Sequence, residues 1–153
     1  MAHVVAKRSG KVNADTAALA GILHGIGKLY VLVRAQAFPE LFRNQDAYRR
    51  IEQMWHANIA KALLENWEMS EEVVAAVHQH EDLEYAHEGD TDLTDVLILA
   101  NLLVSYREHP EGIELNLQGV KPATRMQLDA DAFTRLLEES AAEIEALRSA
   151  LGS

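Results

Sequence analysis

Residues 16–30 read TAALAGILHGIGKLY, and this stretch decides the fold. Ala17, Ala20 and Leu23 follow one another at three-residue steps, which is the spacing of an apolar face on a helix. The face ends at His24, and a turn rich in glycine comes next. The stretch therefore predicts a helix that ends near His24 and a second helical segment that begins after the turn.

Length and composition predict one globular domain built from helices. The chain has 153 residues, of which 48% are apolar and 25% charged, as in ordinary globular proteins. Only 8 glycines and 3 prolines interrupt it, which favours helices. No apolar run resembles a signal peptide or approaches the length of a membrane span, and the lack of cysteine excludes disulfides and thiolate metal sites. We therefore expect a cytoplasmic protein that does not bind membranes.

Charge is distributed unevenly along the chain. Residues 1–64 hold nine Lys/Arg and four Asp/Glu (9 − 4 = +5), whereas residues 65–153 hold five and twenty (5 − 20 = −15), which gives the net charge of −10. An acidic surface repels phosphate backbones, so nucleic-acid binding is not expected. Four arginines in the first half could receive an acidic partner or a phosphate, although a solvated basic face is the simpler interpretation. These are Arg34, Arg43, Arg49 and Arg50.

Apolar periodicity predicts an all-α bundle of about six helices. Asp15 or Thr16 is expected to cap the helix that ends near His24. Further helices are predicted over residues 26–35, 48–66, 71–80, 94–106 and 129–151. The segment 109–122 is predicted to be irregular because glycine and proline recur in it.

Three of the predicted helices are expected to supply the core. Helix 94–106 is apolar on more than one face, which indicates a central, buried position. The last helix carries Phe133, Leu136 and Leu137 on one side. Helix 48–66 has apolar residues at three- and four-residue steps, and these predict its buried face. They include Ile51, Trp55, Ile59, Ala62 and Leu63.

The turn after the first predicted core helix resembles the HD superfamily of metal-dependent phosphohydrolases. In that superfamily the helix ends in leucine, histidine, aspartate, isoleucine, glycine and lysine. His24, Ile26, Gly27 and Lys28 match this pattern. Gly25 stands where the superfamily has the aspartate that joins the histidine on the metal.

The resemblance implies a metal site that has lost its anionic ligands. A second metal-binding aspartate of the superfamily matches Asn101, which offers a neutral carbonyl, and Gly25 offers no ligand atom. A divalent ion in a partly buried site needs compensating negative charge, so an activated water for hydrolysis is not expected. We therefore expect no bound cofactor and no catalytic residue. If zinc, manganese or iron does bind, the resemblance implies the ligands His24, His56, His78 and His80, with Lys28 as the catalytic group.

Residues 52–80 resemble one subgroup, the HDOD (HD-related output) domains. Their pattern is a histidine, a glycine four residues later, paired leucines, and a tryptophan eleven residues after the histidine. His56, the pair Leu63–Leu64 and Trp67 match, whereas Ala60 replaces the glycine. The following helix end resembles the place where these domains carry a histidine pair.

Each of these residues also has a purely structural interpretation. His24 and His56 could be buried and hydrogen-bonded to backbone carbonyls or to Asn101. His78 and His80, separated by Gln79, border an acidic loop and could pair with exposed carboxylates. Trp67 is expected in the core, and Lys28 could be a charge at a helix end. The other histidines are expected at the surface: His3, His87 and His109.

The HDOD resemblance implies an HD-domain-like helical bundle that forms a single domain over residues 1–153. It also implies a non-catalytic signalling module of bacteria that regulates a protein partner by direct contact. One alternative is a metal-dependent phosphohydrolase or phosphodiesterase with a degenerate site. A second alternative is a small-ligand sensor that uses the former active-site cleft. Its polar groups would be His24, Lys28, His56 and Asn101 in an otherwise apolar pocket.

HDOD domains usually carry a helical half before the region of His24, and only about two dozen residues precede it here. Apolar faces over residues 17–23 and 26–33 are therefore expected to be open, and open faces of this kind favour a homodimer. Alternatively, helix 129–151 could fold over them within one chain and place Phe133, Leu136 and Leu137 against the first helices.

Overall fold

The computed structural model describes residues 1–106, 117, 119–150 and 152. Across these residues all regular elements are helices and no strand is present, so the predicted all-α class is confirmed. Most of the segment that was predicted to be irregular, including His109, lies outside the described residues. The helices are α1 (Ala2–Ser9), α2 (Ala14–Leu23), α3 (Ile26–Ala35), α4 (Pro39–Arg43), α5 (Gln45–Asn66), α6 (Glu71–Gln79), α7 (Leu93–Tyr106), α9 (Lys121–Arg125) and α10 (Ala130–Ala150).

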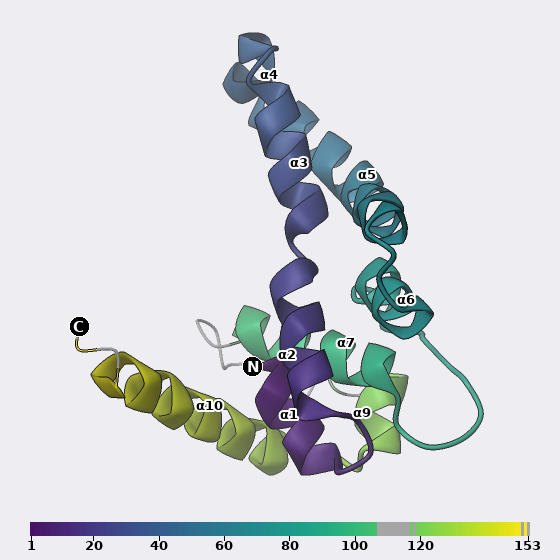
Figure 1. Ribbon diagram of the computed structural model, residues 1–153, viewed down its shortest axis with the longest axis vertical. Helices are drawn as coiled ribbons and strands as arrows, with labels where there is room; N and C mark the ends of the chain where they lie inside the picture. Colours follow the sequence, from purple (N-terminus) through teal and green to yellow (C-terminus); the bar gives the residue numbers. More distant parts are fainter. Residues whose placement is uncertain (107–116, 118, 151, 153) are drawn as a thin grey trace.

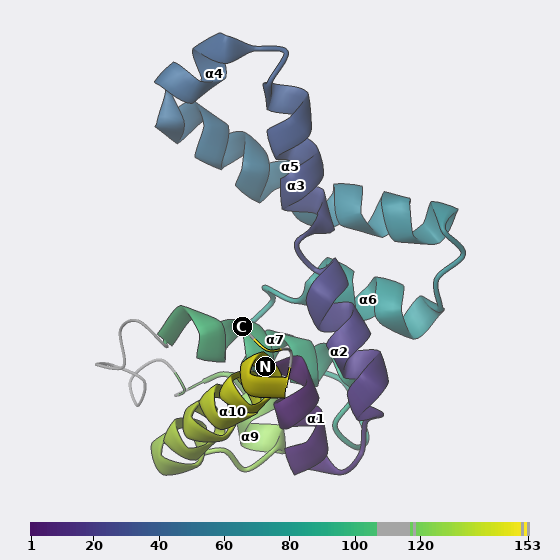
Figure 2. The same cartoon turned by 60° about the vertical axis from the view of Figure 1, so that its left-hand side comes forward.

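The helices form two parts (Figure 1). We call the group made by α1, α2, α7, α9 and α10 the body. We call residues 26–59, which contain α3, α4 and the first part of α5, the arm. Figure 2 shows the arm standing clear of the body. The two parts join where α2 runs into α3 and where α6 packs against α5, α2 and α7.

The central position predicted for helix 94–106 is confirmed by α7. Its side chains from Leu93 to Ala100 are buried, and α1, α2, α6 and α9 pack around it. Burial on all sides explains why this helix is apolar around its whole circumference. Phe133 and Leu136 of α10 complete the same core.

Local hydrogen bonds and backbone angles set the helix ends. Gly10 ends α1 with a φ of 62°, a left-handed conformation that favours glycine. Asn13 caps α2, because its Oδ1 accepts hydrogen bonds from the backbone N–H groups of Asp15 and Thr16, each at 2.9 Å. The predicted cap was therefore wrong, since Asn13 offers the same short acceptor earlier in the chain. Trp67 lies just beyond α5 and is 49% exposed, so its predicted core position was also wrong.

The buried face of α5 differs from the predicted one. His56, Ala60 and Leu64 are buried, whereas Ile51 and Trp55 are exposed. The first part of α5 lies in the arm, where its apolar residues line an open groove against α3 and α4 instead of a closed core. The periodic pattern identified an apolar face, but it could not show whether another element covers that face.

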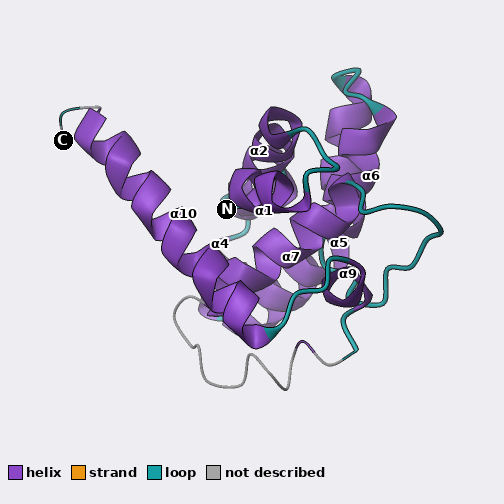
Figure 3. Cartoon of the chain, turned by 90° about the horizontal axis from the view of Figure 1, so that it is seen from below, coloured by secondary structure: helices purple, strands orange, loops and turns teal. Residues whose placement is uncertain are grey.

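The last helix packs on α1, and the faces expected to be open over residues 17–23 and 26–33 are open only in part, since Ala17, Ala20 and Val31 are buried. Lys7 of α1 pairs with Glu143 of α10 at 3.3 Å, and Figure 3 shows α10 extending from the body towards the C-terminus. Ile22 of α2 is 77% exposed and Leu29 of α3 is 54% exposed. The alternative in which this helix covers residues 17–33 is therefore not what the described residues show.

Length and composition alone would allow Ala14–Ala35 to cross a membrane. This corrects the expectation that no apolar run approaches such a length. The segment is not a single helix, because the turn at His24 and Gly25 divides it into α2 and α3. α2 packs against α1, α6 and α7, and Lys28 of α3 pairs with Glu81. The apolar residues of both helices are thus partly buried. Ala17 and Ala20 of α2 lie in the core, and Val31 and Ala35 of α3 are buried where α3 packs against α5, whereas Leu29, Leu32 and Val33 are exposed.

Candidate functional site

A close crossing of α3 and α5 builds the site. A Cβ atom on Gly27 would lie 1.9 Å from the backbone oxygen of His56 and 2.7 Å from its carbonyl carbon. Only a residue without a side chain allows the two backbones to approach this closely. The crossing places the turn at His24, and Lys28 in the first part of α3, beside the middle of α5.

Three histidines converge at this crossing, and we call them, together with Glu81, the histidine cluster. His24 ends α2, His56 lies in the middle of α5, and His80 ends α6. The rings of His24 and His80 have centroids 5.2 Å apart, and those of His56 and His80 are 5.6 Å apart. His56 is 2% exposed and His80 is 1% exposed. The exposed position considered for His80 was therefore wrong.

Backbone carbonyls fix the proton position on each ring. The Nδ1 atom of His24 lies 2.7 Å from the oxygen of Gly21, and that of His80 lies 2.7 Å from the oxygen of Val77. The Nδ1 atom of His56 lies 2.9 Å from the Glu52 oxygen. A carbonyl only accepts, so each Nδ1 is the donor and Nε2 is left with a lone pair in the neutral ring. Among the described residues, the Nε2 atoms of His56 and His80 have no hydrogen-bond partner.

Glu81 brings a carboxylate to these two nitrogens. Its Oε1 lies 3.3 Å from Nε2 of His56, 3.5 Å from Nε2 of His80 and 2.9 Å from Nζ of Lys28. Pairing of His80 with a carboxylate of the acidic loop was expected at the surface, whereas the contact involves two buried rings and includes His56, which was not predicted. The position of Glu81 directly after His80 at a helix end was the available signal.

Burial and charge act in opposite directions on the two neighbours His80 and Glu81. Burial lowers the pKa of His80, which keeps the ring neutral, although Glu81 and the Val77 carbonyl act against this effect. Burial opposes charge on Glu81 too, yet the Lys28 hydrogen bond and the nearby positive groups leave its pKa lowered. The cluster thus combines the neutral ring of His80 with one charged carboxylate.

This donor set has the geometry of a metal site. One ligand atom from each of His56, His80 and Glu81 lies within 4.8 Å of the other two. Bonds of about 2.0–2.1 Å to a tetrahedral zinc ion place ligand atoms roughly 3.4 Å apart, which is close to the two histidine–glutamate distances. Two imidazoles and one carboxylate also suit iron. His24 is not part of this group of ligand atoms, although its ring lies beside that of His80.

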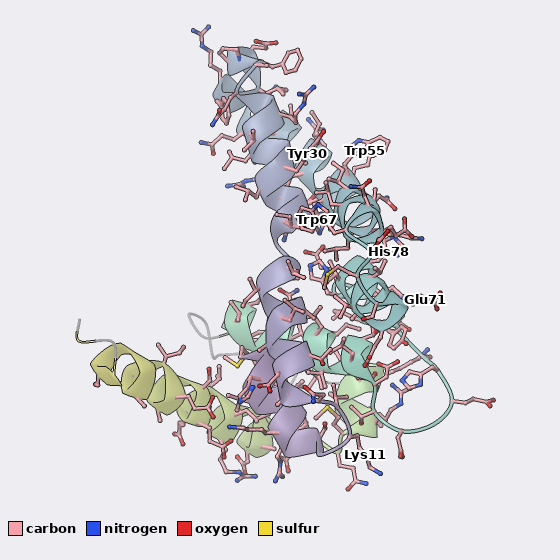
Figure 4. The ribbon with its side chains drawn as sticks, viewed as in Figure 1. Lys11, Tyr30, Trp55, Trp67, Glu71 and His78 are labelled. Carbon is pink, nitrogen blue, oxygen red and sulfur yellow. The ribbon has the colours of Figure 1, made fainter. Side chains whose placement is uncertain are left out.

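The structure separates the other predicted site residues from this cluster. His78 points to Asn58, with its Nε2 3.1 Å from the amide oxygen, and it lies on the outer side of α6 (Figure 4). Gly25 has open space where a Cβ would be. Asn101 and His24 line one cavity of about 380 Å³ between α1, α2 and α7. His56 and Lys28 are not among its lining residues.

A second group of charged residues holds the loop 81–92 against α7 and α9, and we call it the charged cluster. It consists of His87, Asp92, Asp95 and Arg125. Asp95 is fully buried and pairs with Arg125. The surface position expected for His87 was wrong, because its ring packs into this cluster. The sequence offered one signal, since Asp92 and Asp95 are spaced as a capping box and cap each other's backbone N–H groups at the start of α7.

Comparison with known proteins gives one match. The HDOD domain family model matches residues 1–83, which is more than half of the chain. No curated protein and no solved structure matches. The matched range contains α1 to α6, the three converging histidines and Glu81.

Proposed function

Because this chain belongs to the HDOD domain family, we propose that it is a non-catalytic regulatory module that acts through protein contacts. One observation carries the proposal: the arm presents an apolar surface that no described element covers. The side chains of Leu29, Leu32 and Val33 on α3 are 41% to 54% exposed. Exposed apolar patches of this kind are typical of interaction sites.

The histidine cluster supports a non-catalytic role. Gly25 supplies no carboxylate, and Asn101 offers only a neutral amide, in a cavity that it shares with His24 but not with His56. Glu81 is the only carboxylate that the described residues bring to the cluster, and Lys28 already pairs with it. Hydrolysis by a metal-bound hydroxide needs ligands that hold the ion and leave room for an oriented water. We therefore expect no turnover of phosphomonoesters or cyclic dinucleotides.

A second copy of the chain is the occupant that we assign to the outer face of α3. Leu29, Leu32 and Val33 form an uncharged ridge, and an uncharged ridge can pack against its own copy across a two-fold axis without repulsion. The aromatic residues Tyr30 and Trp55 flank the groove beside it (Figure 4). The contact surface of the module is thus the arm, away from the core of the body.

Light scattering at micromolar concentration tests this assignment. The unmodified chain should have the mass of a dimer, and Leu29→Glu should have the mass of a monomer. Val104→Glu is the matched control, because Val104 is an equally exposed apolar residue of α7 in the body. A monomer for the unmodified chain, or a dimer that survives Leu29→Glu, contradicts the proposal.

A single divalent metal ion bound by the histidine cluster is a second candidate function. The observation that favours it is the pair of buried Nε2 atoms without partners, which face a carboxylate oxygen. An Nε2 lone pair and a carboxylate oxygen 3.3–3.5 Å apart repel one another unless a proton or a metal cation lies between them. When bound, such an ion would supply positive charge and join α5 to the end of α6 through His56, His80 and Glu81.

Equilibrium titration with Zn²⁺ tests the second candidate. Binding of one ion that is lost in His56→Ala and in His80→Ala, and kept in His78→Ala, supports it. His78 is the control because it lies on the same helix as His80 but outside the cluster. Absence of binding, or equal loss in His78→Ala, rules the site out.

A further inference from the structure

Both ring nitrogens of His87 face hydrogen-bond acceptors. Nδ1 lies 3.0 Å from the backbone oxygen of Glu88. Nε2 lies 3.0 Å from Oδ2 of Asp95 and 3.4 Å from Oδ2 of Asp92. A neutral imidazole carries one N–H and can satisfy one of these acceptors, whereas the imidazolium satisfies both. The geometry therefore favours the cationic form of His87.

The charges around this ring balance only when His87 is protonated. Two carboxylates, from Asp92 and Asp95, face two cationic groups, His87 and Arg125. Loss of the His87 proton leaves one excess negative charge beside Asp95, which is fully buried. Uncompensated charge in such a position is costly.

The same residues fasten the loop 81–92 to the body. Arg125 of α9 donates from Nη2 to the backbone oxygen of His87 at 3.0 Å. Tyr85 donates its hydroxyl to Oδ2 of Asp92 at 2.7 Å. At the tip of the loop, Asp90 pairs with Lys11 at 3.0 Å, and both side chains are exposed to solvent. Solvent-exposed pairs contribute little, so the attachment depends mainly on the charged cluster.

We propose that the loop 81–92 is a pH-sensitive latch that cationic His87 holds against α7 and α9, and that loss of the His87 proton releases. The hydrogen bond to Asp95 is the main cause that raises the pKa of His87, which agrees with a bound imidazolium. Burial and the hydrogen bond to Asp92 raise the pKa of Tyr85 to about 12, so its hydroxyl keeps the proton while His87 titrates. This pH-sensitive latch goes beyond the protein contacts proposed for the arm and does not depend on them.

The sign of the effect follows from the raised pKa. Histidine in the unfolded chain titrates near 6.5, and the folded form holds its proton to a higher pH. The protonated ring therefore stabilises the latch fully below the pKa that histidine has in the unfolded chain. This stabilisation is lost as the pH rises through the pKa of His87 in the folded protein.

Hydrogen exchange of the amides between residues 83 and 92 tests the latch. After correction for intrinsic exchange rates, the opening equilibrium constant of these amides should increase between about pH 6 and about pH 9. The increase should be on the order of tenfold for each unit by which folding raises the pKa of His87. His87→Gln should open at both pH values with no dependence on pH. His78→Gln is the control and should behave as the unmodified chain, because His78 pairs with neutral Asn58 outside the loop. Opening that does not change with pH, or a pH dependence that persists in His87→Gln, overturns the proposal.

Discussion

The histidine cluster and the charged cluster lie at opposite ends of the same loop, yet they use histidine in opposite ways. In the histidine cluster, carbonyls fix Nδ1–H and leave lone pairs without partners on His56 and His80. In the charged cluster, both nitrogens of His87 face acceptors. The first arrangement can take up a cation, and the second already contains one. The difference shows that the partners of each ring nitrogen, rather than burial alone, decide what a histidine can do.

The largest expected effect on the free energy of unfolding comes from a substitution that breaks the charged cluster. Asp95→Ala removes the buried carboxylate that pairs with Arg125, whose side chain is 17% exposed, and removing one partner of a buried pair costs up to about 3–5 kcal/mol. Denaturant unfolding should show this loss. Asp90→Ala is the control, because its pair with Lys11 is exposed, and it should change the free energy of unfolding by less than about 1 kcal/mol. Equal effects of the two changes would mean that Asp95 does not hold the cluster.

The next effect breaks the crossing that assembles the histidine cluster. Gly27→Ala forces a methyl group against the backbone of His56, and overpacking of this kind costs about 1–3 kcal/mol, occasionally more. Gly25→Ala is the matched control, because a Cβ there meets no atom within 4 Å. Thermal unfolding should separate the two variants clearly. A normal melting temperature for Gly27→Ala would show that α3 and α5 do not cross at this point.

A smaller effect sharpens the contrast in cation binding. Gly25→Asp adds a carboxylate beside His24, where the structure has open space. If the second candidate function holds, the affinity for Zn²⁺ should rise by about tenfold, which corresponds to about 1.4 kcal/mol. The double change Gly25→Asp with Asn101→Asp should add little, since Asn101 shares a cavity with His24 but not with the metal-ligand group of His56, His80 and Glu81. Calorimetric titration of the single and the double variant checks this order. Much tighter binding of Zn²⁺ by the double variant than by Gly25→Asp alone would contradict it.

The smallest effect is the pH dependence of stability, because the two clusters oppose each other. The lowered pKa of His80 means that the unfolded chain binds a proton first, so stability falls as the pH drops below 6.5. The raised pKa of His87 means that stability falls as the pH rises through its folded pKa. Unfolding of His87→Gln should keep the acid-side loss and lose the alkaline-side loss. If His87→Gln instead kept the alkaline-side loss and lost the acid-side loss, the roles assigned to His80 and His87 would be wrong.

The helical class and most helix positions could be predicted from periodicity, because that pattern depends on local spacing alone. The predicted segment 26–35 coincides with α3, and the glycine turn lies between α2 and α3 as expected. Burial was predicted less well. Trp55 and Trp67 are about half exposed, since the pattern identifies an apolar face but not its neighbour.

The candidate site was predicted only in part for a related reason. His24, His56 and His80 were identified from their resemblance to a family pattern, and the structure brings these three together. The contact of Glu81 with two buried rings and the burial of Asp95 were not predicted, because acidic residues in a loop or in the first turn of a helix are usually solvated. Their roles depend on contacts between α3, α5, α6, α7 and α9, which no local spacing contains.

The protonation of the two histidines tests the central contrast most directly. Long-range ¹H–¹⁵N correlation spectra at pH 6.5, the ordinary pKa of histidine, can be assigned with His80→Gln and His87→Gln. We predict that His80 is mostly neutral, with its proton on Nδ1 and a free Nε2, and that His87 is mostly doubly protonated. A protonated His80 beside a neutral His87 would contradict the account.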